Sequence, residues 1–175
     1  MTRELTLTDI AGYLPYGLKI QDEDQDIWTI RQLGNADPCM DGDVGLISDD
    51  GCYEYYTYID DIKPVLRPIQ DLYKEITDKD YNGGEPFVPI VELAKARHPN
   101  FNQYIFYDTE LFVFYSMHSE CGDYSECYDY CEDRLSIAEL DLLHRLHFDY
   151  RGLIDAGLAV SVHDLKRNPY EAANN

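Results

Sequence analysis

Four short stretches of strand character follow one another in the first third of the chain, separated by acidic or glycine-containing turns. The predicted strands are Gly17–Gln21, Ile27–Leu33, Val44–Ser48 and Cys52–Ile59. Residues 22–26 join the first two strands as a longer hairpin loop, and the Asp50–Gly51 pair supplies the positive φ that a tight turn between the last two needs. The pattern therefore predicts an antiparallel β-meander, and closure into a small SH3-like barrel is one arrangement that it allows.

A short helix is expected before these strands, over residues 5–14. Thr6 or Thr8 can act as its N-cap, because a side-chain hydroxyl accepts from the free N–H groups of a helix start. Gly12 and Pro15 mark its expected end. The chain thus begins with a helix that leads into the sheet.

The second part of the chain mixes helices with one hairpin. The predicted helices span residues 69–76, 89–96, 137–147 and 150–156. The first rests on apolar spacing, the second on a proline in its first turn, the third on a capping box of Ser136 and Glu139, and the last on the stop signal Gly157. The β-rich runs 102–107 and 111–117 are joined by a polar turn, which predicts a second hairpin.

These elements together predict an α+β fold. We expect residues 1–66 to form the short helix with the β-meander, and residues 67–175 to form an α+β part with C-terminal helices. One continuous domain is the alternative. With 16 tyrosines, 6 phenylalanines and Trp28, a chain of 175 residues can bury a core without disulfide bonds.

Acidic residues greatly outnumber basic ones: the chain has 34 acidic and 14 basic residues, for a net charge of −20. Most of the excess lies in two tracts. The first acidic tract, residues 22–61, holds twelve carboxylates and the single cation Arg31, and the second acidic tract, residues 108–133, holds eight carboxylates and no cation. Such a surface repels nucleic-acid phosphate and anionic membranes and attracts basic proteins or metal cations. We expect no direct binding to nucleic acid or membrane; an acidic surface without a special partner is the alternative.

Two observations bear on the location of the protein. No apolar run has the length of a signal peptide or of a membrane span. The five cysteines are an odd number, which suits free thiols in a reducing compartment better than a disulfide framework. The predicted location is the cytoplasm.

The strongest metal candidate is a group of zinc-type ligands in one short segment: His118, Cys121, Cys127 and Cys131. Zinc prefers such ligands in a tetrahedron, commonly with two residues between paired cysteines, but three residues separate the last pair here. Free cysteines in an acidic, tyrosine-rich loop are therefore the favoured interpretation. No metal or other cofactor is expected.

A second cluster brings two imidazoles and a carboxylate together: His144, His147 and Asp149. A metallohydrolase uses such groups, but no glutamate base lies between them, and a histidine near a helix C-terminus is also favoured by the helix dipole. A helix end packed under Phe148 is the favoured interpretation. No phosphate-binding loop or nucleophile motif is present, so catalysis has no positive support.

Tyrosines interleave with the acids in both tracts. For residues 53–58 the alternation fits a strand whose inward tyrosines fill a core while its outward acids face water. Residues 123–133 lack the aliphatic side chains of a core, and tyrosines beside carboxylates suit a surface that binds Arg and Lys of a partner. The predicted partner-binding residues are Asp123, Tyr124, Glu126, Tyr128, Asp129, Tyr130 and Asp133.

Two stretches near the ends of the chain carry a resemblance: LTDIAGYLPYGLK at residues 7–19 and LHFDYRGLIDAGLA at residues 146–159, the latter followed by Asn168, Pro169 and Tyr170. They resemble a family of uncharacterised proteins encoded by phages and mobile elements of Bacteroides-like gut bacteria. The resemblance implies a phage origin and a bacterial cytosolic setting. It brings no known activity to any residue.

The sequence thus favours a non-enzymatic interaction protein that binds a basic, nucleic-acid-handling protein through an acidic, DNA-like face. Duplex DNA carries one charge per roughly 1.7 Å, so competition for a DNA-binding cleft requires many carboxylates. The alternatives are a metal-binding module or metal-dependent enzyme built on one of the two histidine-containing clusters, and a structural phage component.

Overall fold

The chain divides into two compact units in the computed structural model. Unit 1 comprises Met1–Pro68 and His147–Pro169, and unit 2 comprises Ile69–Leu146 and Tyr170–Asn175. The first acidic tract belongs to unit 1 and the second to unit 2. The structure describes residues 3–34, 42–48, 50–97, 104–108, 113–118, 129–132 and 135–171.

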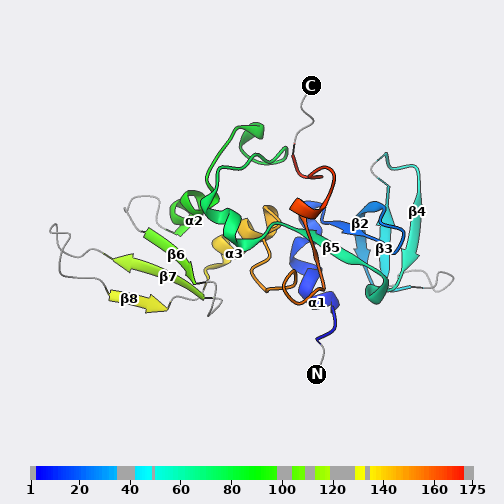
Figure 1. Cartoon of the computed structure of the whole chain (residues 1–175), viewed down its shortest axis with the longest axis horizontal. Helices are drawn as coiled ribbons and strands as arrows, with labels where there is room; N and C mark the ends of the chain where they lie inside the picture. The colour runs from blue at the N-terminus through cyan, green and yellow to red at the C-terminus, as the bar shows by residue number, and fades with distance from the viewer. Residues whose placement is uncertain are drawn as a thin grey trace. The chain divides into compact units, whose positions relative to one another are not determined.

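Unit 1 is built on a six-stranded mixed sheet with the strand order β4-β3-β2-β1-β5-β9 (Figure 1). Its strands are β1 Lys19–Gln21, β2 Ile27–Leu33, β3 Val44–Ile47, β4 Glu54–Thr57, β5 Lys63–Leu66 and β9 Val160–Ser161. The first four form the predicted antiparallel meander. The α+β fold and its N-terminal meander are therefore confirmed.

The sheet of unit 1 is open, with β4 and β9 at its two ends, instead of closed into an SH3-like barrel. The sequence predicts neither β5 nor β9. Pro64 argues against a strand because it lacks a backbone donor, yet β9 pairs only with Val65 and Leu66 and leaves Pro64 beyond its end. At two residues, β9 is too short to show a hydrophobic period.

The predicted opening helix is present, but only part of it is α-helical. α1 Leu7–Ile10 begins after the N-cap Thr6 and continues directly into the 3-10 helix η1 Ala11–Tyr16. The predicted end near Pro15 is wrong, because the chain turns at Gly17, whose left-handed conformation (φ 67°) only glycine adopts freely.

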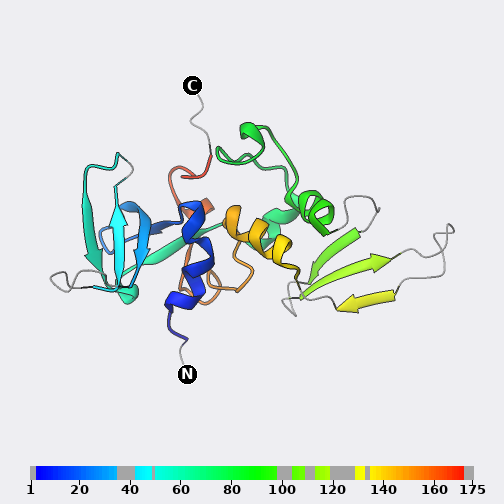
Figure 2. The same cartoon turned by 180° about the vertical axis from the view of Figure 1, so that it is seen from behind.

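The core of unit 1 is one hydrophobic cluster between the sheet and the segments packed on it. Figure 2 shows α1 and η1 as a blue ribbon beside the strands. The cluster combines side chains of this ribbon, of the sheet and of the returning segment 147–169; among them are Ile10, Tyr13, Ile20, Ile30, Leu46, Leu153 and Ala159. The returning segment therefore shares a core with the meander, although unit 2 separates the two in the sequence.

The described part of unit 2 contains two α-helices, two short 3-10 helices and a three-stranded antiparallel sheet of order β6-β7-β8. Its elements are η3 Ile69–Tyr73, η4 Asn82–Gly84, α2 Pro89–Arg97, β6 Tyr104–Asp108, β7 Val113–His118, β8 Asp129–Glu132 and α3 Ile137–Arg145. The predicted hairpin, the helix at 89–96 and the capped start of α3 are confirmed. The predicted helix at 69–76 is only the short η3, and β8 is an additional strand.

Tyr81 links the two helices of unit 2. Its hydroxyl donates to Glu92 of α2 at 3.1 Å, and the guanidinium of Arg145 of α3 lies 5.1 Å from the centre of its ring. Phe87 packs against the same ring at 4.7 Å between centroids. Burial, together with the charge of Glu92, raises the pKa of the Tyr81 hydroxyl.

Residues 150–156 form turns instead of the predicted short helix. The remaining short helices of unit 1 are η2 Ile59–Asp61 and η5 Val162–Asp164. The predicted division between residues 66 and 67 stays a prediction; the two units first divide after Pro68. Within the ranges described above, no helix combines the length and the apolar character needed to cross a bilayer.

Candidate functional site

Two of the predicted partner-binding residues, Asp129 and Tyr130, lie in β8, at one end of the strand order of the small sheet (Figure 1). β8 pairs with β7, and in this pairing Asp129 is opposite His118 and Tyr130 is opposite Met117. The other five lie outside the described residues: Asp123, Tyr124, Glu126, Tyr128 and Asp133. The binding role of this segment stays a prediction.

The two described members of the possible zinc group lie on neighbouring strands. His118 ends β7 opposite Asp129, and Cys131 follows Asp129 by two residues in β8. Cys121 and Cys127 lie outside the described residues. In the part of the chain that the structure describes, no three His, Cys, Asp or Glu side chains gather as a metal site.

The second histidine-containing cluster is divided between different local environments. His144 lies in α3 of unit 2, whereas His147 and Asp149 are buried in unit 1. His147 adopts a positive φ of 58°, and its Nε2 atom lies 3.0 Å from the carbonyl oxygen of Tyr16. This contact joins His147, two residues beyond the end of α3, to Tyr16, the last residue of η1.

Asp149 organises the turns that follow it. Its carboxylate accepts hydrogen bonds from the N–H groups of Leu153 and Ile154, each at 2.8 Å. Burial raises the pKa of Asp149, and these hydrogen bonds oppose the rise. Because a side chain takes these backbone donors, the segment is held in turns where a helix was predicted. The contacts of His147 and Asp149 support a structural role for this pair.

The acidic loop, residues 22–26, is the best-defined charged feature of the first tract. It closes between β1 and β2 through backbone hydrogen bonds from Asp22 N–H to the Asp26 carbonyl and from Gln25 N–H to the Asp22 carbonyl, both at 3.1 Å. Gln25 has a positive φ of 67°, which lets the chain reverse. Three of its side chains are exposed carboxylates: Glu23, Asp24 and Asp26.

Asp22 attaches the acidic loop to two aromatic side chains. Its Oδ2 atom accepts hydrogen bonds from Trp28 Nε1 at 2.7 Å and from the Tyr55 hydroxyl at 3.2 Å, while Oδ1 accepts from the N–H of Asp26 at 2.8 Å. The Trp28 and Tyr55 rings meet edge to face with 4.7 Å between centroids. These contacts tie the loop backbone to the sheet, and a loop restrained in this way loses less entropy on binding.

Tyr55 responds to the negative charge of this loop. Burial raises its pKa, and the carboxylate of Asp22 adds to the rise by its charge and its hydrogen bond. With smaller contributions from Asp24 and Asp26, the pKa of Tyr55 reaches about 12. Because this pKa exceeds that of an ordinary tyrosine, the contribution of Tyr55 to stability is complete below pH 10 and is lost as the pH rises through 12.

We predict that Asp22→Ala lowers the pKa of Tyr55 toward 10, because the variant removes both the nearest negative charge and the acceptor of the phenol proton. Carbon NMR of ring-labelled tyrosine, assigned with Tyr55→Phe, measures the titration. Glu4→Gln removes an exposed carboxylate elsewhere in unit 1 and should leave the Tyr55 pKa unchanged. An equal pKa in wild type and Asp22→Ala would contradict the coupling.

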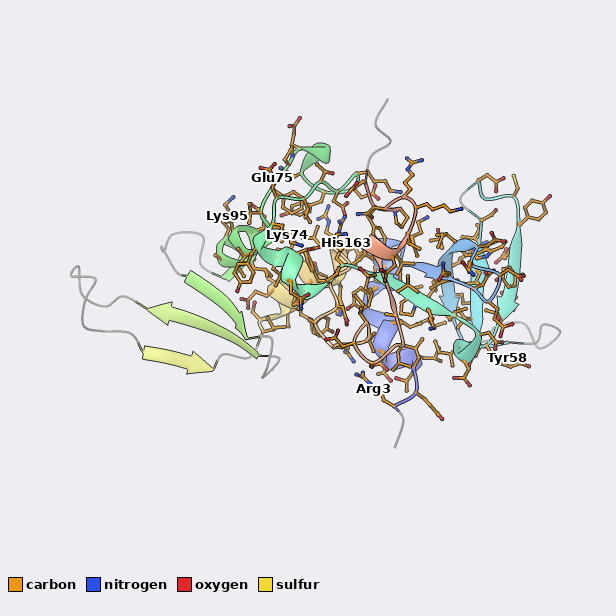
Figure 3. All side chains as sticks on the ribbon, in the orientation of Figure 1. Arg3, Tyr58, Lys74, Glu75, Lys95 and His163 are labelled. Atoms are coloured by element: carbon orange, nitrogen blue, oxygen red, sulfur yellow. The ribbon has the colours of Figure 1, made fainter. Side chains whose placement is uncertain are left out.

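The tyrosines of residues 53–58 do not all face the core. Tyr55 packs against the hydrophobic cluster, as predicted. Tyr53 is 70% exposed and Tyr58 is 47% exposed, so neither of these two fills the core. Tyr56 lies opposite Gly45 on the other face of the sheet, where a Cβ atom on the glycine would lie 3.3 Å from the tyrosine ring. Figure 3 shows Tyr58 near the end of β4.

Every described carboxylate of the first acidic tract reaches the surface of unit 1. The exposed ones are Glu23, Asp24, Asp26, Asp50, Glu54 and Asp60, and the half-buried ones are Asp22, Asp43 and Asp61. Arg31, the cation of the tract, pairs with Glu54 through Nη1 and Oε2 at 2.9 Å. An exposed ion pair of this kind contributes less than about 1 kcal/mol, and it leaves the tract strongly negative.

The support that Trp28 and Tyr55 give to the acidic loop is not evident from the amino-acid pattern alone. Trp28 is within reach of that inference, because it follows the loop on the second strand of a recognisable hairpin. Tyr55 is not, because its contact with Asp22 spans 33 positions and depends on the pairing of three further strands. No protein-family model, curated protein or solved structure matches this chain.

Proposed function

We propose that the protein is a non-enzymatic, acidic interaction protein of phage origin, which binds a basic, nucleic-acid-handling protein in the bacterial cytoplasm as a DNA mimic. The observation that carries the proposal is the acidic loop. There, the bonds of Asp22 to Trp28 and Tyr55 tie the backbone that carries three exposed carboxylates to the sheet. The phage origin and the cytoplasmic location rest on the resemblance of the two terminal stretches.

A DNA mimic needs negative charge at fixed positions. A cleft that binds duplex DNA is lined with Lys and Arg, so a protein that occupies it must offer carboxylates that are already ordered. In unit 1, the fixed backbone of the acidic loop supports this requirement by setting where its carboxylates attach. The second acidic tract, with the predicted partner-binding residues, adds charge in unit 2. The net charge of −20 also accelerates the encounter with a basic partner.

Release of DNA-binding proteins from DNA–cellulose tests this proposal. We predict that the wild-type protein is not itself retained on the column and releases basic proteins that a bacterial lysate has deposited there. The triple variant Glu23→Gln, Asp24→Asn and Asp26→Asn should release several-fold less, because three positioned charges are lost while exposed charges contribute little to stability.

The matched control is Glu4→Gln, Asp155→Asn and Asp164→Asn, which removes the same charge from exposed positions of unit 1 outside the acidic tract. This variant should release as much as the wild type. Polyglutamate at equal total charge serves as the non-specific anion. Equal losses in the two triple variants, or equal release by polyglutamate, would contradict a positioned acidic surface.

A further inference from the structure

β4 forms one end of the six-stranded sheet, and Figure 1 shows it as the outermost strand of unit 1. It pairs antiparallel with β3, with Glu54 opposite Ile47. At the start of this ladder the Ser48 N–H donates to the carbonyl of Tyr53 at 2.9 Å. Together with the register, this bond shows which residues of β4 turn their backbone groups toward β3.

Hydrogen-bonded and non-hydrogen-bonded pairs alternate along an antiparallel ladder. Because Tyr53 bonds to β3, Tyr55 and Thr57 also direct their backbone groups to β3, and the residues between them direct theirs the other way. The N–H and C=O groups of Glu54 and Tyr56 therefore point to the side of β4 on which no strand pairs within the described residues. A row of this kind is a template for a further strand.

The composition of this edge favours strand addition. Proteins commonly protect an open edge with lysine or proline, but residues 53–58 read YEYYTY and contain neither. Tyr53 and Tyr58, at the two ends of the strand, are 70% and 47% exposed. Tyrosine and threonine also suit extended backbone. The edge thus combines open backbone groups with aromatic area on either side of them.

The charge around the β4 edge favours one kind of added strand, a basic one. Asp50 and Asp60 are exposed beside β4, and Glu54 on β4 is exposed although one of its oxygens pairs with Arg31, so a strand rich in Lys and Arg would find negative charge there. A second copy of this chain would instead bring its own carboxylates against them, and like charges on paired strands are destabilising. Electrostatic complementarity therefore favours a basic segment over self-association.

We propose that β4 receives an extended, basic segment of the partner protein as an additional strand. The backbone groups of Glu54 and Tyr56 bond to the added strand, the exposed tyrosines cover its side chains, and the carboxylates pair with its Lys or Arg residues. This inference rests on the proposed function, because it describes how the basic partner engages unit 1.

Binding of a short peptide of alternating Lys and Val tests strand addition. The comparison peptide has the same sequence but is N-methylated at three consecutive central residues, which blocks both edges of its strand and keeps its charge. We predict that N-methylation weakens binding to the wild-type protein about tenfold or more, since main-chain hydrogen bonds are lost. Amide exchange should slow at Glu54 and Tyr56 on binding of the unmodified peptide, with little change at Tyr55.

Two variants separate the backbone from the charge. Glu54→Pro removes an outward N–H that β3 does not use, and we predict that it weakens peptide binding about tenfold. Glu54→Gln keeps that N–H and should weaken binding less, with a smaller salt dependence. Near-ultraviolet circular dichroism checks that both variants fold, and the comparison of the two peptides on wild-type protein needs no variant at all.

The outcomes distinguish this inference from the proposed function. Equal affinity of the two peptides would overturn strand addition at β4, even if release from DNA–cellulose succeeds. Discrimination between the peptides without any such release would support strand addition and overturn the DNA-mimic role. Binding that depends only on peptide charge would likewise reject β4 as a docking strand.

Discussion

Asp149→Ala is expected to lower the free energy of unfolding of unit 1 by about 3 kcal/mol. The carboxylate is buried and accepts the N–H groups of Leu153 and Ile154, both at 2.8 Å. Each buried donor left without an acceptor costs about 1–3 kcal/mol, and the turn that contains Leu153 supplies part of the core. Urea titration followed by the fluorescence of Trp28, the single tryptophan of the chain, measures the loss in unit 1.

Asp155→Ala is the matched control for this prediction, because Asp155 lies in the same turn region but is exposed. Its effect should stay within about 0.5 kcal/mol. Asp149→Asn keeps one acceptor oxygen, so its loss of unfolding free energy should lie between those of Asp149→Ala and Asp155→Ala. A stability of Asp149→Ala equal to that of Asp155→Ala would show that the carboxylate does not hold the turns.

Asp9→Ala is expected to cost about 2 kcal/mol. The Asp9 carboxylate is buried and lies 2.7 Å from Arg3 Nη2 and 3.4 Å from Arg151 Nη1, and it also accepts the N–H and hydroxyl of Thr6. Removal of one member of a buried ion pair costs about 3–5 kcal/mol, but the side chains of Arg3 and Arg151 are 45% and 36% exposed, so water recovers part of this. Urea titration by Trp28 fluorescence measures the change.

The pH dependence of stability separates the two aspartates. Burial alone would raise the pKa of Asp9, but the hydrogen bonds of Thr6 and the charge of Arg3 hold it below 3.8. The stabilisation from Asp9 is therefore present above pH 3.8 and is lost as the pH falls through the lower folded-state pKa. For Asp149, whose pKa burial raises, only the contribution linked to its titration depends on pH: it is complete below pH 3.8 and is lost as the pH rises through the folded-state pKa, while the hydrogen bonds to Leu153 and Ile154 remain.

Asp9→Asn should consequently flatten the loss of stability at acid pH, whereas Asp149→Asn should not. Stability curves measured for wild type and both variants across the acid range test these opposite signs. An acid limb in Asp9→Asn as steep as that of the wild type would contradict the assignment of Asp9.

Local signals in the sequence were sufficient for much of the fold. The capping box of Ser136 and Glu139 places the start of α3, and the turn with Gly51 (φ 72°) places the β3–β4 hairpin, because in both cases residues within a few positions determine the conformation. The acidity of the surface is equally local, since it is a property of composition. These features needed no knowledge of the tertiary structure.

Long-range pairing could not be predicted in the same way. β5 pairs in parallel with β9, whose residues lie almost a hundred positions later, and neither strand is long enough to show a period. Arg67, 1% exposed, is a residue type that is almost never buried. Its backbone pairs with the residues around Phe148, which follow the segment Ile69–Leu146 of unit 2 in the sequence. Only the tertiary structure brings these segments together.

The same distinction applies to the candidate site. The excess of carboxylates in residues 22–61 is visible in the sequence, but the base on which the acidic loop rests is not. Asp22, Trp28 and Tyr55 meet because β1 pairs with β2, β2 with β3 and β3 with β4. The sequence therefore indicates that the surface is acidic, and the structure adds that the backbone of the acidic loop is tied to the sheet through Asp22.

Salt dependence of partner binding tests the acidic interaction role most directly. The measurement is the dissociation constant of the complex with a protein released from DNA–cellulose, taken from about 50 to about 300 mM salt. We predict a steep weakening with salt for the wild type. The slope should be smaller in the acidic-loop triple variant and in the variant Asp123→Asn, Glu126→Gln, Asp129→Asn and Asp133→Asn, and unchanged in the matched control. Identical slopes in all four proteins would contradict a binding role for the acidic tracts.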